Sequence, residues 1–297
     1  MPLRPTPSPT SSGDAADRGP GSSIGRHRSV DRLLEDGRPR SATEPRSATE
    51  PRSATEPRSA TRREGRMNFE TWEPAYEALL SDFGFDRAAD ERARDVAAAL
   101  ASPFPTDRFD MLADATVAIA GAGPSLTDDV DLERAAAADA VVAASTAVDV
   151  LVEAAISVDV MVTDLDKNPE TARRLTASGT PVAAHAHGDN VPAVRTWIPR
   201  FTAEHVLVTT QAAPRGPVVN HGGFTDGDRA AFLADHAGAA ELVFVGWDFA
   251  DPNVSPTKAR KLEWAARLLH WLELRRDARF DVLDDHRAEL SLPWLST

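Results

Sequence analysis

The chain has 297 residues, no cysteine and a formal net charge of −13 at pH 7. The absence of cysteine excludes disulfide bonds, thiolate nucleophiles and zinc sites with cysteine ligands. No run reaches the roughly 18 consecutive apolar residues of a transmembrane helix. The N-terminus has no apolar signal segment. We therefore expect a cytoplasmic protein.

The acidic charge is concentrated after residue 66. Residues 67–297 carry 20 basic and 37 acidic side chains, a net charge of −17, and the lysines of the chain are Lys167, Lys258 and Lys261. An acidic, alanine-rich and lysine-poor composition is typical of cytosolic proteins of extreme halophiles. The alternative is an acidic enzyme of a mesophile. Such a surface repels nucleic acid and anionic membranes, so neither is an expected partner.

Residues 1–66 are rich in Pro, Ser, Arg and Gly, and the repeat Arg-Ser-Ala-Thr-Glu-Pro runs from Arg40 to Pro57. A repeat without an apolar position cannot bury a core, so this low-complexity segment is predicted to be disordered. Met67 directly precedes the first foldable sequence, and it is a candidate for the true start of the protein. Residues 67–113 have apolar residues at helical spacing, which predicts a small helical N-terminal subdomain.

From residue 114 onward, short apolar runs of strand length alternate with helical patterns. The predicted strands are Val117–Ala120, Val141–Ala144, Val158–Val162, Val182–Ala184, Val206–Thr209 and Leu242–Val245. The predicted helices include Asp131–Ala138, Thr146–Ala155, Pro169–Ala177 and Asp226–Ala237. This alternation is typical of an α/β fold with a mostly parallel, Rossmann-like sheet and helices on both faces. We predict one such domain over residues 114–276, followed by a C-terminal tail, residues 277–297.

Two aspartates, Asp164 and Asp166, stand directly after the third predicted strand. Carboxylates at positions i and i+2, where a strand leaves the sheet, can face one point, and hard oxygen ligands there suit Mg²⁺ that holds phosphates. The alternative is a solvated acidic turn. Polar motifs also follow the other predicted strands, and ligands of an open α/β sheet bind outside the carboxyl ends of its strands. We therefore predict the active site at this edge.

The first strand leads into Gly121-Ala122-Gly123-Pro124-Ser125, which allows a tight turn whose backbone N–H groups can face an anion. We predict a nucleotide or phosphate turn there, and a turn needed only for packing is the alternative. After the fourth strand, His187 is predicted to hydrogen-bond a substrate or a phosphate, with Asp189 as an outer metal ligand. His185 and His187 as purely structural residues are the alternative, because no third soft ligand has zinc spacing.

The fifth strand leads to a loop with Asn220 and the Gly222-Gly223 pair, which resembles a loop that closely approaches a ligand. Asp226 and Asp228 open the next helix, where N-capping alone explains at least one of them.

The last predicted helix begins with Ser255 as its N-cap, so Lys258 and Lys261 fall in its first turns, where the helix dipole disfavours cations. A bound anion would resolve this conflict, because backbone N–H groups and ammonium groups would share it. A salt bridge to Asp251 or Glu263 is the alternative.

In their order and spacing these motifs resemble the archaeal 6-hydroxymethyl-7,8-dihydropterin pyrophosphokinase (MptE-like) family, which is distantly similar to thiamine pyrophosphokinase. The resemblance covers roughly residues 67–276. It rests on Gly121–Leu126, Val162–Asp166, His185–Asn190, Thr209–Gln211, Gly222–Arg229, Gly246–Phe249 and Lys258–Leu262. It implies Mg²⁺-dependent transfer of the terminal diphosphate of ATP to the hydroxymethyl group of a reduced pterin, with release of AMP.

The resemblance also implies site residues. They are Asp164, Asp166, Asp189 and Asp228 for the metal, Lys258, Lys261 and His187 for catalysis, and Gly121, Gly123, Ser125, Thr210, Asn220, Gly223 and Asp248 for binding ATP and the pterin. Asp248 or Asn220 would hydrogen-bond the pterin edge, where a polar pairing discriminates strongly.

Two positions depart from the family pattern. Ser145-Thr146-Ala147 stands where the family tends to carry Asp-Gly-Ala, so an expected carboxylate near the metal is missing. Lys167 replaces a small residue and could add a phosphate contact. The alternative functions are a thiamine pyrophosphokinase, an Asp-x-Asp nucleotide-sugar glycosyltransferase and a nucleotide-binding regulatory protein without turnover. The sequence leaves the oligomeric state, monomer or homo-oligomer, open.

Overall fold

One parallel sheet organises residues 66–295, the part of the chain that the computed structural model describes. Its strands are β1 (Thr116–Ala120), β2 (Ala140–Ala144), β3 (Val160–Thr163), β4 (Val182–Ala186), β5 (Val206–Thr210) and β6 (Glu241–Val245). They lie in the order β5-β4-β3-β2-β1-β6, and every neighbouring pair is parallel. The predicted parallel α/β sheet is confirmed. The segment predicted to be disordered lies outside the described residues, except for Arg66.

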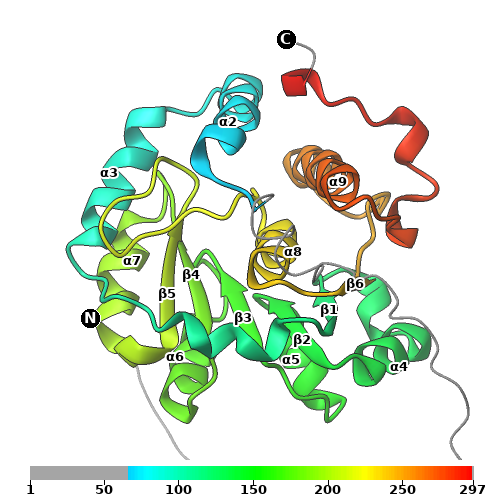
Figure 1. Ribbon diagram of the computed structural model, residues 1–297, viewed down its shortest axis with the longest axis horizontal. Coiled ribbons are helices and arrows are strands. Elements are labelled where there is room, and N and C mark those ends of the chain that lie inside the picture. The colour runs from blue at the N-terminus through cyan, green and yellow to red at the C-terminus, as the bar shows by residue number, and fades with distance from the viewer. Residues whose placement is uncertain (1–65, 296–297) are drawn as a thin grey trace, which may run out of the picture. The chain divides into compact units, whose positions relative to one another are not determined.

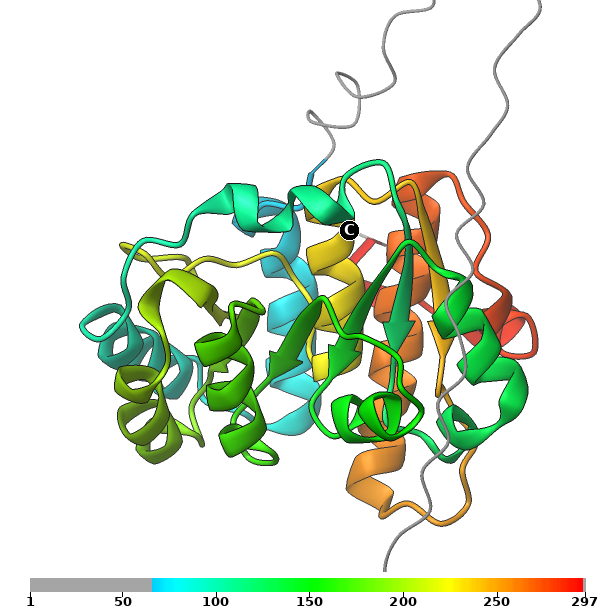
Figure 2. The same ribbon diagram turned by 90° about the horizontal axis from the view of Figure 1, so that it is seen from below.

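Helices cover both faces of this sheet (Figure 1, Figure 2). They are α2 (Phe69–Phe83), α3 (Arg87–Ala98), α4 (Asp129–Ala137), α5 (Ala147–Glu153), α6 (Pro169–Ser178), α7 (Val191–Trp197), α8 (Asp226–Ala237) and α9 (Pro256–Arg276). One face packs against α2, α8 and α9, and the other against α3 to α7. Because both faces are covered, β2 to β5 are buried along their whole length. Across residues 66–295, no helix combines the length and apolarity that a membrane span requires.

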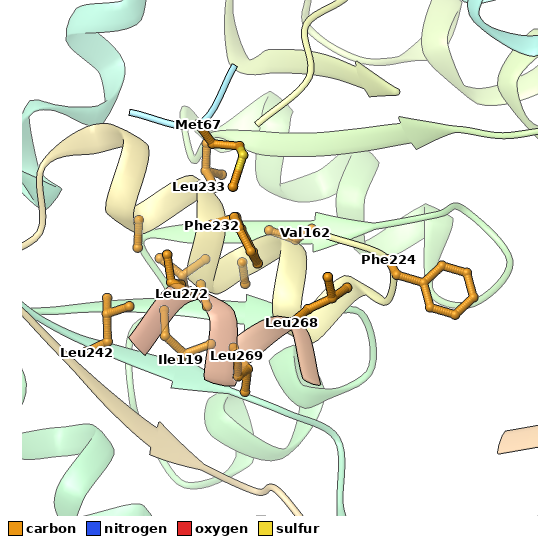
Figure 3. Close-up of a cluster of buried hydrophobic side chains, with 14 of the residues drawn as sticks. Met67, Ile119, Val162, Phe224, Phe232, Leu233, Leu242, Leu268, Leu269 and Leu272 are labelled. Carbon is orange, nitrogen blue, oxygen red and sulfur yellow. The ribbon is translucent and has the colours of Figure 1, made fainter. Parts of the chain in front are cut away.

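The core between the sheet and helices α8 and α9 fixes these two helices in place. Leu268 and Leu269 of α9 lie in one buried cluster with Phe232 of α8 and with Ile119 and Val162 of the sheet (Figure 3). Burying a large apolar side chain contributes about 1.5–3 kcal/mol. The cluster therefore packs α8, and α9 from Trp264 onward, against the sheet.

The strand order reverses beside β1. Strands β1 to β5 follow one another across the sheet, and the chain then returns through α8 and places β6 on the other side of β1. Because all strands are parallel, their carboxyl ends share one edge of the sheet, which we call the carboxyl edge. Ligands of open α/β sheets bind at this edge, where the strand order reverses.

The predicted N-terminal subdomain shares its core with the sheet. Trp72 and Tyr76 of α2 are fully buried in the cluster that contains α8 and α9. Trp72 stacks on Trp271 with ring centroids 6.4 Å apart, and its indole N–H donates to the carbonyl of Gln211 (2.9 Å). Helix α3 packs on the opposite face of the sheet, beside α7, β4 and β5. Helices α2 and α3 therefore lie on opposite faces of the sheet.

The described part of the predicted C-terminal tail, residues 277–295, packs against the domain. Phe280, Leu283 and Trp294 are buried in the same core as α9, and Trp294 stacks on Trp264 at 5.6 Å. The acidic character of this segment concealed its apolar residues, whose burial binds it to the domain.

Candidate active site

Asp164 and Asp166 stand at the carboxyl edge, directly after β3. Between them Leu165 is buried and has a positive φ of 69°, which is rare for a bulky residue. Its N–H donates to the Thr163 hydroxyl (3.0 Å). Anchoring Leu165 in the core leaves the two aspartates at the surface on either side of it. The N–H of Asp166 donates to Oδ1 of Asp164 (3.3 Å), which keeps the two carboxyl groups together.

A third carboxyl group, that of Asp226 at the start of α8, lies beside this pair. Burial, and then repulsion by Asp164, raise the pKa of Asp226 to about 8. Burial and a hydrogen bond with Asp164 raise the pKa of Asp166 to about 6. Burial would also raise the pKa of Asp164, but its hydrogen bond with Asp166 and the charge of Arg229 outweigh burial, so this pKa is lowered. An ionised Asp164 beside two carboxyl groups with raised pKa values forms a charge pattern that a divalent cation relieves.

These carboxyl groups fit Mg²⁺ as a donor set. They supply only hard oxygen atoms, and Mg²⁺ at phosphate sites takes one or two carboxylates and keeps several waters. Among the described residues no three His, Cys, Asp or Glu side chains already form a metal-binding group, so phosphates and water would complete the coordination. Ser145, where the resemblance led us to expect a carboxylate, donates instead to the carbonyl of Lys167 (3.4 Å).

Asp228 was predicted as a metal ligand, and in the structure its carboxylate caps helix α8. The residue is fully buried, and its carboxylate accepts the N–H groups of Phe224 (2.5 Å) and Thr225 (2.8 Å) and the hydroxyl of Thr225. With Thr225 it forms the capping box of α8. Since both of its oxygens are engaged inside the protein, Asp226 takes its place in the candidate metal site.

Arg229, which the sequence analysis did not single out, is the buried cation of the site. Its guanidinium lies 3.3 Å from Oδ1 of Asp226 and 3.5 Å from Oε1 of Gln211. Its Nε has no partner among the described residues, and neither has Nε2 of His185. Both side chains line a cavity of about 10 Å³, which is about the space that one water needs.

The two histidines have different environments. His185 is 1% exposed, and its Nδ1 forms a hydrogen bond with the Thr209 hydroxyl (2.9 Å), so it is a core residue. His187 is partly exposed, and its Nε2 lies 3.9 Å from Oδ2 of Asp164. Burial lowers the pKa of both imidazoles, which makes them neutral at pH 7. Asp189 is exposed and adds an electrostatic effect on His187.

Three residues predicted to contact substrate shape the loops of the site instead. Asn220 is buried, donates to two backbone carbonyls of the preceding loop (2.9 Å each) and accepts the N–H of Gly222 (2.8 Å). Thr210 is buried, and its hydroxyl accepts the N–H two residues on (3.2 Å). Gly223 has a φ of 91°, and a Cβ there would lie 2.6 Å from Cα of Arg229. We therefore assign these three residues to loop architecture.

The loops that follow β1 and β6 cross at the reversal point. A Cβ on Gly121 would lie 2.5 Å from the carbonyl oxygen of Gly246, and a Cβ on Gly123 would lie 2.3 Å from Oδ2 of Asp248. Both glycines therefore have a packing reason. Their close approach lets Ser125 donate its N–H (3.0 Å) and its hydroxyl (2.9 Å) to Oδ2 of Asp248. Among the described residues Oδ1 of Asp248 forms no hydrogen bond.

The lysines of the chain gather near the acidic group. Lys258 lies in the first turn of α9, whose N-cap Ser255 accepts its backbone N–H (3.2 Å). Partial burial and repulsion by Lys167 lower the pKa of Lys258, and the charge of Asp226 opposes them. The ammonium of Lys261 lies 5.8 Å from the ring centre of Phe224. The acidic side chains and the lysines therefore influence one another at the carboxyl edge.

The predicted alternative, a salt bridge between a lysine and Asp251 or Glu263, does not occur in residues 66–295. Glu263 pairs with Arg267, and no lysine in this range has a carboxylate within ion-pair distance. Arg260 in the same turn is paired with Asp82 (2.7 Å), which also accepts the indole N–H of Trp264 (2.7 Å).

Asp90 of α3 connects the N-terminal helices to the site, and the sequence analysis missed it. Its buried carboxylate accepts hydrogen bonds from Tyr76 (2.8 Å), Gln211 (2.7 Å) and the N–H of Gly188 (2.7 Å). Gly188 and Gln211 lie in the loops after β4 and β5. A single aspartate in a helix with equal numbers of acidic and basic residues carries no sequence signal of such a role.

The fold and the site together define a class. This is a parallel α/β protein whose carboxyl edge combines repelling carboxyl groups with lysines that form no ion pair within residues 66–295, as enzymes that handle phosphates require.

Comparison with known proteins narrows the class to one family. A family model described as 6-hydroxymethylpterin diphosphokinase MptE-like matches residues 95–254. A 6-hydroxymethyl-7,8-dihydropterin pyrophosphokinase of Methanothermobacter thermautotrophicus is 37% identical over 234 residues, 72% of this chain and 99% of the relative. Proteins of the same name from Methanocaldococcus jannaschii (30% over 241 residues, 72% and 99%) and Pyrococcus furiosus (35% over 225 residues, 70% and 95%) also match. The chain belongs to the MptE-like family of 6-hydroxymethylpterin diphosphokinases.

Proposed function

We propose that this protein transfers the diphosphate group of ATP to the hydroxymethyl group of 6-hydroxymethyl-7,8-dihydropterin, with Mg²⁺, and releases AMP. Family membership and the names of the three relatives support the pterin substrate. The observation that carries the proposal is the combination of mutually repelling carboxyl groups with unpaired lysines. A magnesium polyphosphate supplies a cation for the first group and anionic oxygens for the second.

Each charged group has a defined task in this proposal. Asp164, Asp166 and Asp226 would hold Mg²⁺, which when bound would offset the charge of the phosphates. Lys258 and Lys261 contact the phosphate oxygens. None of these lysines has to break an ion pair before it binds, because none is formed within the described residues.

The chemical step is a displacement at the β-phosphorus. The hydroxyl oxygen of the pterin attacks this atom, the bond from the β-phosphorus to the α,β-bridging oxygen breaks, and AMP leaves. His187 is the candidate acceptor of the hydroxyl proton, because its imidazole is neutral and lies beside Asp164. The free oxygen of Asp248 would accept hydrogen bonds from the N–H groups of the pterin edge.

The proposal is tested by incubating the purified protein with ATP, Mg²⁺ and 6-hydroxymethyl-7,8-dihydropterin in concentrated KCl and by measuring AMP and pterin diphosphate. Asp164→Asn should lower AMP formation about 100-fold, because it removes a metal ligand. Asp107→Asn, a matched change of an exposed aspartate outside the site, should have no effect. Full activity of Asp164→Asn would reject the metal assignment.

The same assay separates the alternative functions. AMP formation with thiamine but not with the pterin would identify a thiamine pyrophosphokinase. Release of a nucleoside diphosphate from a nucleotide sugar would identify a glycosyltransferase. A melting temperature that rises with ATP and Mg²⁺, without any AMP, would identify a regulatory protein.

A further inference from the structure

Three phenylalanines form an aromatic patch at the carboxyl edge, and no role in the proposed reaction accounts for it. Phe83 and Phe85 stack with ring centroids 5.1 Å apart and an interplanar angle of 16°. Phe224, far away in the sequence, lies 5.2 Å from Phe83 and 6.5 Å from Phe85. Phe224 is buried and Phe83 is partly buried, whereas Phe85 is 39% exposed. We call Phe83, Phe85 and Phe224 the aromatic patch.

The patch is part of the immediate surroundings of the candidate site. Phe224 precedes Asp226 by two residues, and its backbone N–H is held by Asp228 (2.5 Å). In Figure 3 its ring points away from the labelled core side chains, toward the side to which the strand arrows point. The ammonium of Lys261 lies 5.8 Å from the ring centre of Phe224. The patch therefore adjoins both the carboxyl groups and the lysines.

Local structure explains only part of the patch. Gly84 ends α2 in the left-handed conformation, and the N–H of Phe85 donates to the carbonyl of Leu80 (3.0 Å), which is a common way to end a helix. An apolar residue often follows such a glycine to make a hydrophobic contact. Any apolar side chain satisfies that requirement. The requirement does not explain an aromatic ring that stays exposed beside a polar site.

We propose that the aromatic patch binds a planar nitrogen heterocycle of a substrate, which stacks on Phe85. This inference rests on the proposed function, in which both substrates carry such a ring, the adenine of ATP and the pterin. Every heteroaromatic base has a π face, so an exposed phenylalanine that is backed by a second ring is a suitable platform. Phe83 and Phe224 hold Phe85 in place, and Lys261 lies where phosphates attached to a stacked nucleotide base can reach it.

Equilibrium binding tests this inference without requiring turnover. Affinities for a non-hydrolysable ATP analogue with Mg²⁺, and separately for 6-hydroxymethyl-7,8-dihydropterin, are measured by calorimetry on the full chain in concentrated KCl. Phe85→Leu keeps an apolar contact after Gly84 but removes the π face, so it should weaken one of the two ligands roughly tenfold. The ligand that is affected identifies the stacked ring. Phe104→Leu, in the aromatic pair of Phe104 and Phe109 outside the site, is the matched control and should change neither affinity.

A second variant keeps the test decisive if Phe85→Leu lowers the melting temperature. Phe85→Trp retains a π face and should keep both affinities, and the emission of the added tryptophan should change when the stacked ligand binds. Unchanged affinities in Phe85→Leu at an unchanged melting temperature would overturn the inference, and so would a Phe85→Trp protein without a new ligand-dependent emission change. Affinity that depends on Phe85 in a protein that forms no AMP would contradict the proposed function alone.

Discussion

Asp226 provides the sharpest test of the metal site, because its effects on stability and on metal binding should have opposite signs. The pKa of Asp226 is raised to about 8 in the folded protein, against about 3.9 in an unfolded chain. Between these values the folded state binds more protons than the unfolded state, so stability falls as the pH rises through this window. About four pH units correspond to an upper limit of about 5 kcal/mol.

The perturbation is Asp226→Asn, which keeps the shape of the side chain but cannot ionise. Without Mg²⁺ this variant should have a higher unfolding free energy than the wild type at pH 8, and the difference should vanish as the pH falls toward 4. The charge of Arg229 lowers the pKa of Asp226, and this opposing effect is already contained in the value of about 8. Chemical denaturation at several pH values measures the unfolding free energy of each protein and its pH dependence.

The same variant should bind Mg²⁺ more weakly. Below pH 8 the metal must displace a proton from Asp226 of the wild type, so its affinity should rise by up to about tenfold per pH unit between about pH 6 and 8. Calorimetry in buffers of different ionisation enthalpy counts the released protons. A variant that is destabilised at pH 8, together with a wild type whose Mg²⁺ affinity does not vary with pH, would refute the reasoning.

Three other changes test separate parts of the molecule. Lys258→Ala should raise the KM for ATP about tenfold in steady-state assays with little change in melting temperature, because this lysine forms no ion pair within residues 66–295; an unchanged KM would contradict the phosphate role. Gly123→Ala should lower the melting temperature, since its Cβ would lie 2.3 Å from Oδ2 of Asp248; a fully stable variant would show that the loop relaxes freely. Burial would raise the pKa of Glu273, but hydrogen bonds from Arg287 and other donors prevail and lower it to about 2. Glu273→Gln should therefore cost about 3 kcal/mol of unfolding free energy at pH 7. This cost should shrink as the pH falls from about 4 to 2, and a pH-independent cost would point to packing.

The position of the site could be predicted from the sequence, because parallel strands bring all loops that follow them to one edge. Several individual residues could not, because the same residue type serves a ligand or a turn equally well. In Thr225-Asp226-Gly227-Asp228 the Thr-x-x-Asp spacing is that of a capping box, which identifies Asp228 as the capping residue and leaves Asp226 free. Capping had been considered for the two aspartates together, and this spacing separates them.

Long-range partners explain why other contacts of the site could not be predicted from the sequence. Asn220 has the residue type of a ligand contact, but its partners are backbone groups of a neighbouring loop, whose position depends on the folded sheet. Asp90 acts through Gly188 and Gln211, which lie about a hundred residues further along the chain. Hydrophobic patterning likewise underestimates the contribution of residues 277–295 to the core, because the apolar side chains buried there are few but large.

The separation of Lys258 from the carboxyl groups is itself a property of the fold. Burial lowers the pKa of Lys258 and the charge of Asp226 opposes this shift, yet the side chains of Lys258 and Asp226 form no ion pair in the described residues. The first turns of α9 are attached to Asp82 of α2, which accepts hydrogen bonds from Arg260 (2.7 Å) and Trp264 (2.7 Å). Without this anchor the lysine could approach the acidic side chains and occupy the space that a polyphosphate needs.

Asp82→Asn should therefore raise the KM for ATP more than it lowers stability. The pair of Asp82 and Arg260 is solvent-exposed, and exposed pairs contribute at most about 1 kcal/mol. Glu170→Gln, which removes the similarly exposed pair with Arg173, is the matched control and should change neither quantity appreciably. If Asp82→Asn lowered the melting temperature and left the KM for ATP unchanged, the contact would serve only to attach α9 to α2. A raised KM at nearly constant melting temperature would show that the gap between the lysines and the carboxyl groups is maintained for the substrate.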